Sequence, residues 1–189
     1  MTEWKEYKLG EVITIKYGKD HKNLKDGKYP VYGSGGIMRY ADNFLYDKES
    51  ILIPRKGSLN NIFYREKAFW TVDTMFYSEI DTTKVFPKFL YYQLTLVDFE
   101  NLNVGSAVPS LTIPIINEID ISLPPLPEQI RIASILSSLD DKIDLLHREN
   151  KTLEAMAETL FRQWFIEEAK EDDMCLLGEV IKTTSGGTP

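Results

Sequence analysis

The spacing of hydrophobic positions changes partway along the chain. In residues 1–123, short apolar runs alternate with turn signals such as Asp26-Gly27. Short runs rich in β-branched and aromatic residues, bounded by Gly, Pro, Asn and Asp, are typical of strands. The predicted strands are residues 12–15, 29–32, 50–53, 62–64, 69–72 and 75–77. Residues 87–97 instead have the spacing of a short amphipathic helix, with Pro87 in its first turn. We therefore expect a strand-rich α+β domain over residues 1–123.

A proline-rich segment ends this domain. Pro124 and Pro125 stand next to each other within a short linker, residues 124–126. Adjacent prolines exclude helix before them and stiffen the chain into an extended segment. Pro127 suits the first turn of a helix, and Glu128 is favourable at a helix N-terminus. The pattern predicts that a helix begins at residue 127.

Residues 127–171 carry a heptad repeat. With Gln129 at position a, every d position is Ile or Leu, and no Gly or Pro interrupts the run. A helix of about 44 residues is roughly 66 Å long, which is too long for its own small domain to cover. We expect it to form an antiparallel coiled coil with a partner copy, giving a homodimer. The predicted dimerisation residues are Ile132, Leu136, Leu139, Ile143, Leu146, Asn150, Leu153, Leu160 and Trp164.

Two features of this helix have alternative interpretations. Asn150 at an a position either fixes the register at a cost in stability, or is a polar residue tolerated in a wet stretch. Phe161, Trp164 and Phe165 form an apolar cluster larger than a two-stranded seam needs. This cluster either packs against the partner's domain or a following repeat, or belongs to an ordinary coiled-coil core.

The sequence Leu-Gly-Glu-Val-Ile occurs twice, at residues 9–13 and again at 177–181. Gly18 and Gly186 continue the match in the same register. An exact repeat at such a distance indicates a duplicated unit. We expect residues 172–189 to be the start of a second, truncated repeat. The chain is then either a natural half-length form or a shortened version of a longer protein.

Composition and charge narrow the class of protein. A hydrophobic content of 43% and an aromatic content of 12% are globular values. No apolar run approaches the roughly 20 residues of a membrane span, and Cys175 is the only cysteine. We expect a cytoplasmic protein with no membrane partner. The net charge is −7, and the acidic excess lies after residue 120. Seven lysines between Lys5 and Lys28 form either a solvated surface or a basic face that follows phosphates.

The sequence contains no recognisable catalytic centre. The Gly33–Gly36 run lacks the lysine of a phosphate-binding loop and the third glycine of a dinucleotide fingerprint. Two histidines and one cysteine are too few soft ligands for a zinc site. We therefore predict no catalytic residue, metal or cofactor.

Three loops of small and polar residues are the candidate binding features: residues 32–36, 53–61 and 105–112. Arg and Asn can pair with two atoms of a guanine or adenine edge, while Lys and Ser serve phosphates. The predicted DNA-contact residues are Arg55, Lys56, Ser58, Asn60 and Asn61, with Ser34, Arg39 and Lys16 as weaker candidates. Each loop taken alone also fits a generic surface turn.

Taken in order, these motifs resemble the specificity subunit of Type I restriction–modification systems. The resemblance rests on Tyr29-Pro-Val-Tyr-Gly-Ser-Gly-Gly36, Ile51-Leu-Ile-Pro-Arg-Lys-Gly57, Gly105-Ser-Ala-Val-Pro-Ser-Leu111 and Pro124-Pro-Leu-Pro-Glu-Gln129 leading into the long helix. It implies a non-catalytic subunit that holds two target-recognition domains apart on antiparallel spacer helices.

By this resemblance, residues 1–123 are one target-recognition domain that reads half of a bipartite site in double-stranded DNA. The implied partners are methyltransferase (modification) subunits, with a restriction/translocase subunit in the full complex. A pair of copies would read an inverted repeat, since protein and site symmetry match. The alternative is a coiled-coil scaffold whose head domain binds protein rather than DNA. An enzyme is a more remote alternative.

Overall fold

The computed structural model describes residues 3–105, 107–168 and 181–182. The chain divides into two compact units, residues 1–136 and 137–189. We call the first unit the head. The predicted second repeat lies outside the described residues, apart from Ile181 and Lys182.

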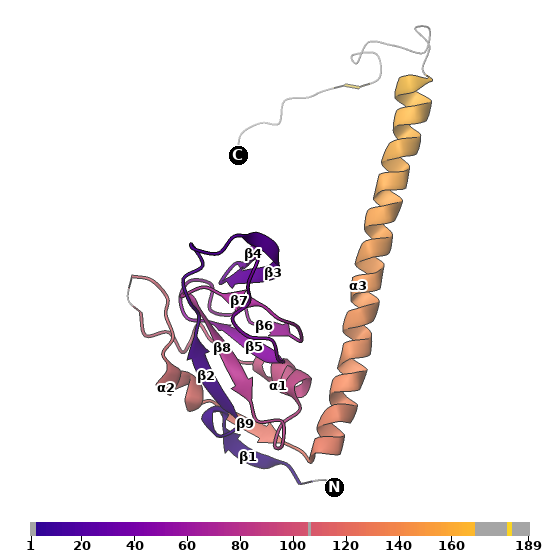
Figure 1. Cartoon of the computed structure of the whole chain (residues 1–189). Coiled ribbons are helices and arrows are strands. Elements are labelled where there is room, and N and C mark those ends of the chain that lie inside the picture. The colour runs from indigo at the N-terminus through magenta and orange to yellow at the C-terminus, as the bar shows by residue number, and fades with distance from the viewer. Residues whose placement is uncertain (1–2, 106, 169–180, 183–189) are drawn as a thin grey trace. The chain divides into compact units, whose positions relative to one another are not determined.

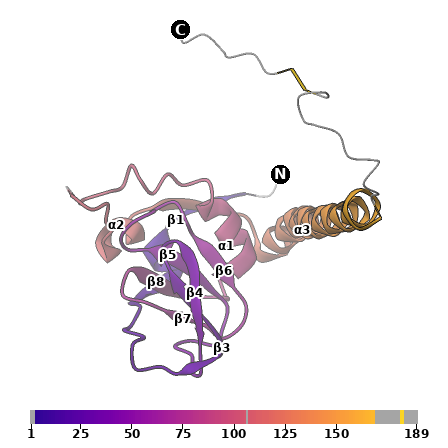
Figure 2. The same cartoon turned by 90° about the horizontal axis from the view of Figure 1, so that it is seen from above.

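The head is built from three small sheets. The central sheet has the order β2-β8-β5-β6, with every neighbouring pair antiparallel. Its strands are β2 (Ile13–Tyr17), β8 (Met75–Ile80), β5 (Ser50–Pro54) and β6 (Phe63–Arg65). A second sheet joins β4 (Gly36–Ala41), β3 (Asp26–Gly33) and β7 (Trp70–Thr71). The third sheet pairs β1 (Lys5–Lys8) with β9 (Asp120–Leu123) and lies at the opposite end of the head from the second (Figures 1 and 2).

Helices in the head are short. They are the 3-10 helix η1 (Leu9–Glu11) and the α-helices α1 (Pro87–Leu94) and α2 (Ile113–Asn117). The predicted strand-rich α+β class is confirmed, and each of the six predicted strands overlaps an observed one. The predicted helix 87–97 ends three residues early, since Thr95 caps it. The spacing argument missed β1, β4, β9 and α2.

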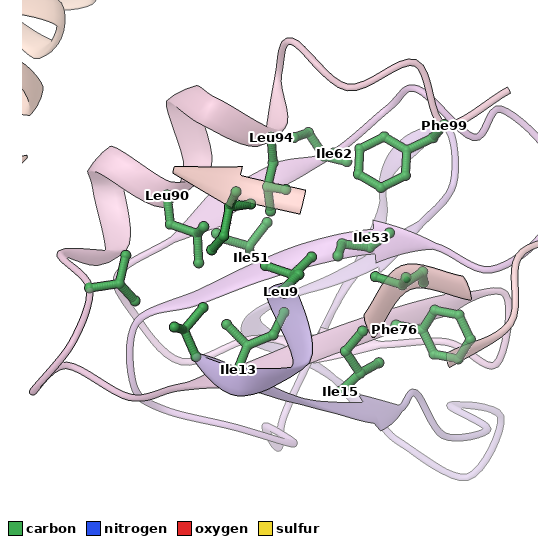
Figure 3. Packing of buried hydrophobic residues seen from close by; sticks show 14 of the residues in the cluster. Leu9, Ile13, Ile15, Ile51, Ile53, Ile62, Phe76, Leu90, Leu94 and Phe99 are labelled. Carbon is green, nitrogen blue, oxygen red and sulfur yellow. The ribbon is translucent and has the colours of Figure 1, made fainter. Parts of the chain in front are cut away.

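The main hydrophobic core lies between the central sheet and α1. All five residues of β5 are buried, which explains why this strand is a continuous apolar run instead of an alternating one. Ile51 of β5 and Leu90 and Leu94 of α1 are fully buried in the same cluster (Figure 3). Leu9 of η1 joins them, so the turn after β1 closes the core from the other side. Burying each such side chain contributes about 2 kcal/mol.

A buried glutamine joins the start of the long helix to the head. Helix α3 spans Leu126–Arg162, and the side chain of Gln129 in its first turn is 1% exposed. Its Oε1 accepts a hydrogen bond from the Phe86 backbone N–H at 2.8 Å. Its Nε2 donates to the backbone carbonyls of Lys84 at 3.2 Å and Pro124 at 2.8 Å. One side chain therefore satisfies three backbone groups that precede α1 or α3.

The first turns of α3 pack against the head. Ala133 is 1% exposed, and Ile132 is partly buried against the main core cluster. The expectation that the helix cannot bury its stripe on its own domain is therefore wrong for these turns. Pro124 is buried as well, so the proline-rich segment is part of the head and not a free linker. The assignment of Ile132 to a dimer seam stays a prediction, because the head already covers part of its side chain.

Beyond the head, the apolar residues at the a and d positions of α3 are exposed, and we call this row of residues the apolar stripe. Leu139, Ile143, Leu146 and Leu153 are between 44% and 60% exposed. A π-helical segment, Gln163–Glu167, follows α3 directly. Trp164 lies in that segment, where the 3.5-residue spacing no longer applies, so its a position stays a prediction. Of the predicted helix 127–171, residues 169–171 lie outside the described part. None of the described helices combines the length and apolar character that a membrane span requires.

We expect Gln129→Leu to destabilise the head by about 2 kcal/mol, because it leaves buried backbone donors and acceptors unpaired at nearly constant side-chain volume. Urea unfolding followed by circular dichroism measures the change. The matched control is Gln163→Leu, whose parent side chain is exposed and which should change stability by less than about 0.5 kcal/mol. Equal effects of the two substitutions would contradict the anchoring role.

Candidate nucleic-acid interface

Three loops that are far apart in the sequence meet on the head. They are the β3–β4 turn at Ser34 and Gly35, the segment 55–61 after β5, and the loop 103–111 before α2. Asn61 Nδ2 donates to the Ser34 carbonyl at 3.1 Å. Gly57 N–H donates to the Pro109 carbonyl at 3.1 Å, and Lys56 forms an antiparallel bridge with Ser110. The segment 55–61 is therefore the centre of a continuous surface.

Glycine is required where two of these loops touch. Gly57 has a φ of +93°, which L side chains rarely adopt. A Cβ atom at this position would lie 2.8 Å from Ser34 Oγ. Gly57 therefore accommodates both the positive φ and the close approach of the Ser34 side chain. Ser34, predicted as a weaker contact residue, packs against the loop that carries the main candidates.

Arg55 is held in place before any ligand arrives. Its guanidinium lies over the ring of Tyr17, 5.5 Å from the ring centroid. Its Nη1 donates to the Asp73 carbonyl at 3.1 Å, and its backbone N–H donates to the Thr74 carbonyl at 2.8 Å. These contacts use one side of the guanidinium, which carries five N–H donors in total. A positioned guanidinium loses little conformational entropy when it pairs with a flat acceptor.

Lys56 and Ser58 differ from Arg55 in having free side chains. Both are exposed. Within residues 3–105 and 107–168, neither side chain has a hydrogen-bonding or ionic partner. The Lys56 ammonium is therefore available to pair with a phosphate, and the nearby Ser58 hydroxyl can donate a hydrogen bond to a second phosphate.

Three predicted contact residues have partners inside the protein. Lys16 pairs with Glu79 at 3.6 Å. Arg39 pairs with Asp26 at 3.1 Å and donates to the Leu24 carbonyl at 2.8 Å. Asn60 Oδ1 accepts a hydrogen bond from the Phe99 backbone N–H at 2.9 Å. These contacts support local structure, and a role of the three residues in DNA contact stays a prediction.

Sequence reasoning missed two residues that shape the surface. Tyr17 is 55% exposed and carries the guanidinium of Arg55. Asn103 Oδ1 accepts hydrogen bonds from the backbone N–H groups of Gly105 and Ser110, both at 2.8 Å. The spacing Asn-x-Gly is a turn signal that could have indicated the role of Asn103. No local signal could have paired Tyr17 with Arg55, because Tyr17 ends β2 and Arg55 follows β5, far away in the sequence.

An aromatic–cation stack also lies directly before the β3–β4 turn. The guanidinium of Arg65 is 5.5 Å from the ring centroid of Tyr32, and Tyr32 is 5% exposed. Burial raises the pKa of the Tyr32 phenol, and the nearby Arg65 charge opposes that rise.

The described residues contain no group of three or more His, Cys, Asp or Glu side chains placed to hold a metal ion. What the three loops present together is a guanidinium, an ammonium, a hydroxyl and an amide. This is the set of donors that proteins use on phosphates and base edges.

The chain is similar to known proteins of one family. Residues 1–155 match the family model described as the Type I restriction modification DNA specificity domain. A Mycoplasma pneumoniae protein assigned provisionally as a type I specificity subunit is 31% identical over 144 residues, 71% of this chain and 47% of its own length. The specificity subunit of the type I restriction enzyme MjaIX from Methanocaldococcus jannaschii is 28% identical, over 88% of this chain and 40% of its own length.

Solved structures show the same fold. The S subunit of a type I restriction–modification system from M. genitalium superimposes with a TM-score of 0.75 at 20% identity. The match covers 88% of this chain and 47% of that one, so the present chain spans about half of the proteins that it matches. The predicted resemblance is confirmed, and the chain belongs to the family of Type I restriction modification DNA specificity domains.

Proposed function

We propose that the head reads one half of a bipartite site in double-stranded DNA. In this proposal the chain is a non-catalytic subunit that positions adenine methyltransferase subunits on the DNA and serves a restriction/translocase subunit in the full complex. The observation that carries the proposal is the convergence of three loops around Arg55 and Lys56. Membership of the specificity-domain family supports it.

The chemistry of the surface divides into two roles. Arg55, oriented by Tyr17 and the Asp73 carbonyl, suits the two acceptors of a guanine edge in the major groove. Lys56 and Ser58, exposed and without side-chain partners among the described residues, suit phosphate contacts that position the head without selecting a sequence. Asn61 keeps its amide close to the β3–β4 turn, where it can join either role.

The second part of the proposal is that two copies of the chain pair through the exposed apolar residues of α3. A homodimer formed through this stripe presents two heads related by two-fold symmetry. Such a dimer matches a site whose two half-sequences are inverted repeats. The alternative is a scaffold whose head binds protein. DNA binding that weakens as the salt concentration rises distinguishes the present proposal from that alternative.

For Lys56→Gln, we expect weaker binding of the chain to a mixed-sequence 30-base-pair duplex. The slope of log K against log salt concentration should fall by about 1, because one phosphate contact and its released counterion are lost. Fluorescence anisotropy from low to moderate salt measures the slope. Lys88→Gln on α1 makes the same charge change away from the three loops and should leave the slope unchanged. Failure of the parent chain to bind the duplex even at low salt would support the protein-binding alternative.

For Arg55→Lys, we expect lost sequence discrimination with little change in binding to mixed-sequence DNA. The charge stays, but the two-donor fork is lost, at a cost of about 1–3 kcal/mol for one base pair. Selection from a randomised duplex library, using the chain together with its methyltransferase, gives the preferred bases for parent and variant. An unchanged preference at every position would show that Arg55 reads no base.

We expect Leu146→Asp to convert the dimer to monomer, because it buries a charge in the proposed seam. Sedimentation velocity measures the change. The neighbouring Leu145 is similarly exposed, at 39% against 44%, but occupies a c position outside the seam. Leu145→Asp should therefore remain dimeric, and a loss of dimer in both variants or in neither would contradict the heptad assignment.

A further inference from the structure

The residues that flank the open stripe of α3 indicate how a second copy would align with it. Four of them occupy g positions, each directly before an a position: Ile135, Lys142, Glu149 and Met156. Ile135 and Met156 are 59% and 56% exposed, although neither belongs to the a and d set. Along the helix, the four g residues are therefore apolar, basic, acidic and apolar in that order.

In an antiparallel pair of helices, g positions lie beside g positions of the other helix, because the direction of one helix is reversed. If Ile143 faces Leu146 of the second copy, Lys142 lies beside Glu149 of that copy. Ile135 then lies beside Met156 of the second copy. Two-fold symmetry repeats each pair. Both kinds of g–g contact therefore join residues of matching character, and flanking charges are known to set orientation and partner choice in coiled coils.

Neighbouring alignments lose this match. A shift by one heptad in one direction places Lys142 beside Lys142 of the second copy, and a shift in the other places Glu149 beside Glu149. A parallel pair places Glu149 beside Glu154 of the other helix and Lys142 beside His147. The parallel pair does bring the two Asn150 side chains together, which is favourable, but it places like charges at the flanks.

The alignment that pairs Lys142 with Glu149 has its two-fold axis between Asp144 and Leu145, close to the middle of α3 (Leu126–Arg162). It places Leu136 opposite Leu153 and Leu139 opposite Asn150 of the second copy. These facing residues lie beyond Gln129, Ile132 and Ala133, which the head covers.

We propose that α3 of two copies pairs antiparallel in one register, with Ile143 facing Leu146 and Lys142 beside Glu149 of the second copy. This inference rests on the homodimer of the proposed function and deepens it. Gln129 and Ile132 are engaged by the head of their own copy, so the central heptads from Leu136 to Leu153 form the seam. The register sets the two helix starts about 55 Å apart at 1.5 Å per residue.

The test is a pair of charge reversals, Lys142→Glu and Glu149→Lys. In the proposed register each variant alone places like charges together twice, so the Kd of self-association should rise about tenfold. An equimolar mixture should form a heterodimer of nearly parental affinity, because both flanking pairs become attractive again. Native mass spectrometry at low salt separates the three species by mass. Arg148→Glu, at an f position outside the seam, should show neither effect.

Cysteine cross-linking in a Cys175→Ser background gives a second readout. Leu139→Cys and Asn150→Cys face each other in the proposed register, so a mixture of the two variants should form an inter-chain disulfide. Neither variant should cross-link with itself. Self-cross-linking of Asn150→Cys would show a parallel pair and overturn the proposal. A stable dimer with no partner preference would overturn the register alone, whereas a monomeric parent chain would overturn the homodimer of the proposed function.

Discussion

The amide of Gln129 is the contact on which the arrangement of the head and its helix depends. It lies in the first turn of α3 and bonds to backbone groups of Lys84, Phe86 and Pro124. A buried backbone group without a partner is costly, so these bonds determine where α1 and α3 begin. The same turns bury Ala133 and part of Ile132, whereas Leu139, Ile143 and Leu146 further along α3 are between 44% and 57% exposed.

The cations near the candidate interface differ in whether a carboxylate of the protein neutralises their charge. Lys16 and Arg39 are paired with carboxylates, and this pairing lowers their availability to an external phosphate. Arg55 is positioned by an aromatic ring and a carbonyl, which restrict its motion without neutralising its charge. Lys56 is exposed. A chain with a net charge of −7 can therefore still present a local basic surface, since the relevant potential is that of the unneutralised groups nearby.

The loop contacts and the helix stripe suit different demands of recognition. The loops are held by backbone hydrogen bonds and by Gly57, which tolerates both the positive φ and the close approach of Ser34. Side chains can vary on such a frame without changing its shape, which is an advantage for a domain that must read a particular sequence. The stripe on α3 has the opposite property. Its pattern of apolar and charged positions permits few alignments in the proposed dimer.

Local periodicity and motifs read in order were enough to predict the strand-rich class, the long helix and the family. The sequence also identified the three loops that carry Arg55, Lys56 and Asn61. Only the tertiary structure decided that the loops meet, that Tyr17 supports Arg55, and that Lys16, Arg39 and Asn60 are engaged elsewhere. It also placed Gln129 in the head, although the heptad pattern gave it an a position. The physical reason is the same in each case: a partner distant in sequence decides whether a polar side chain is available, and local spacing carries no information about that partner.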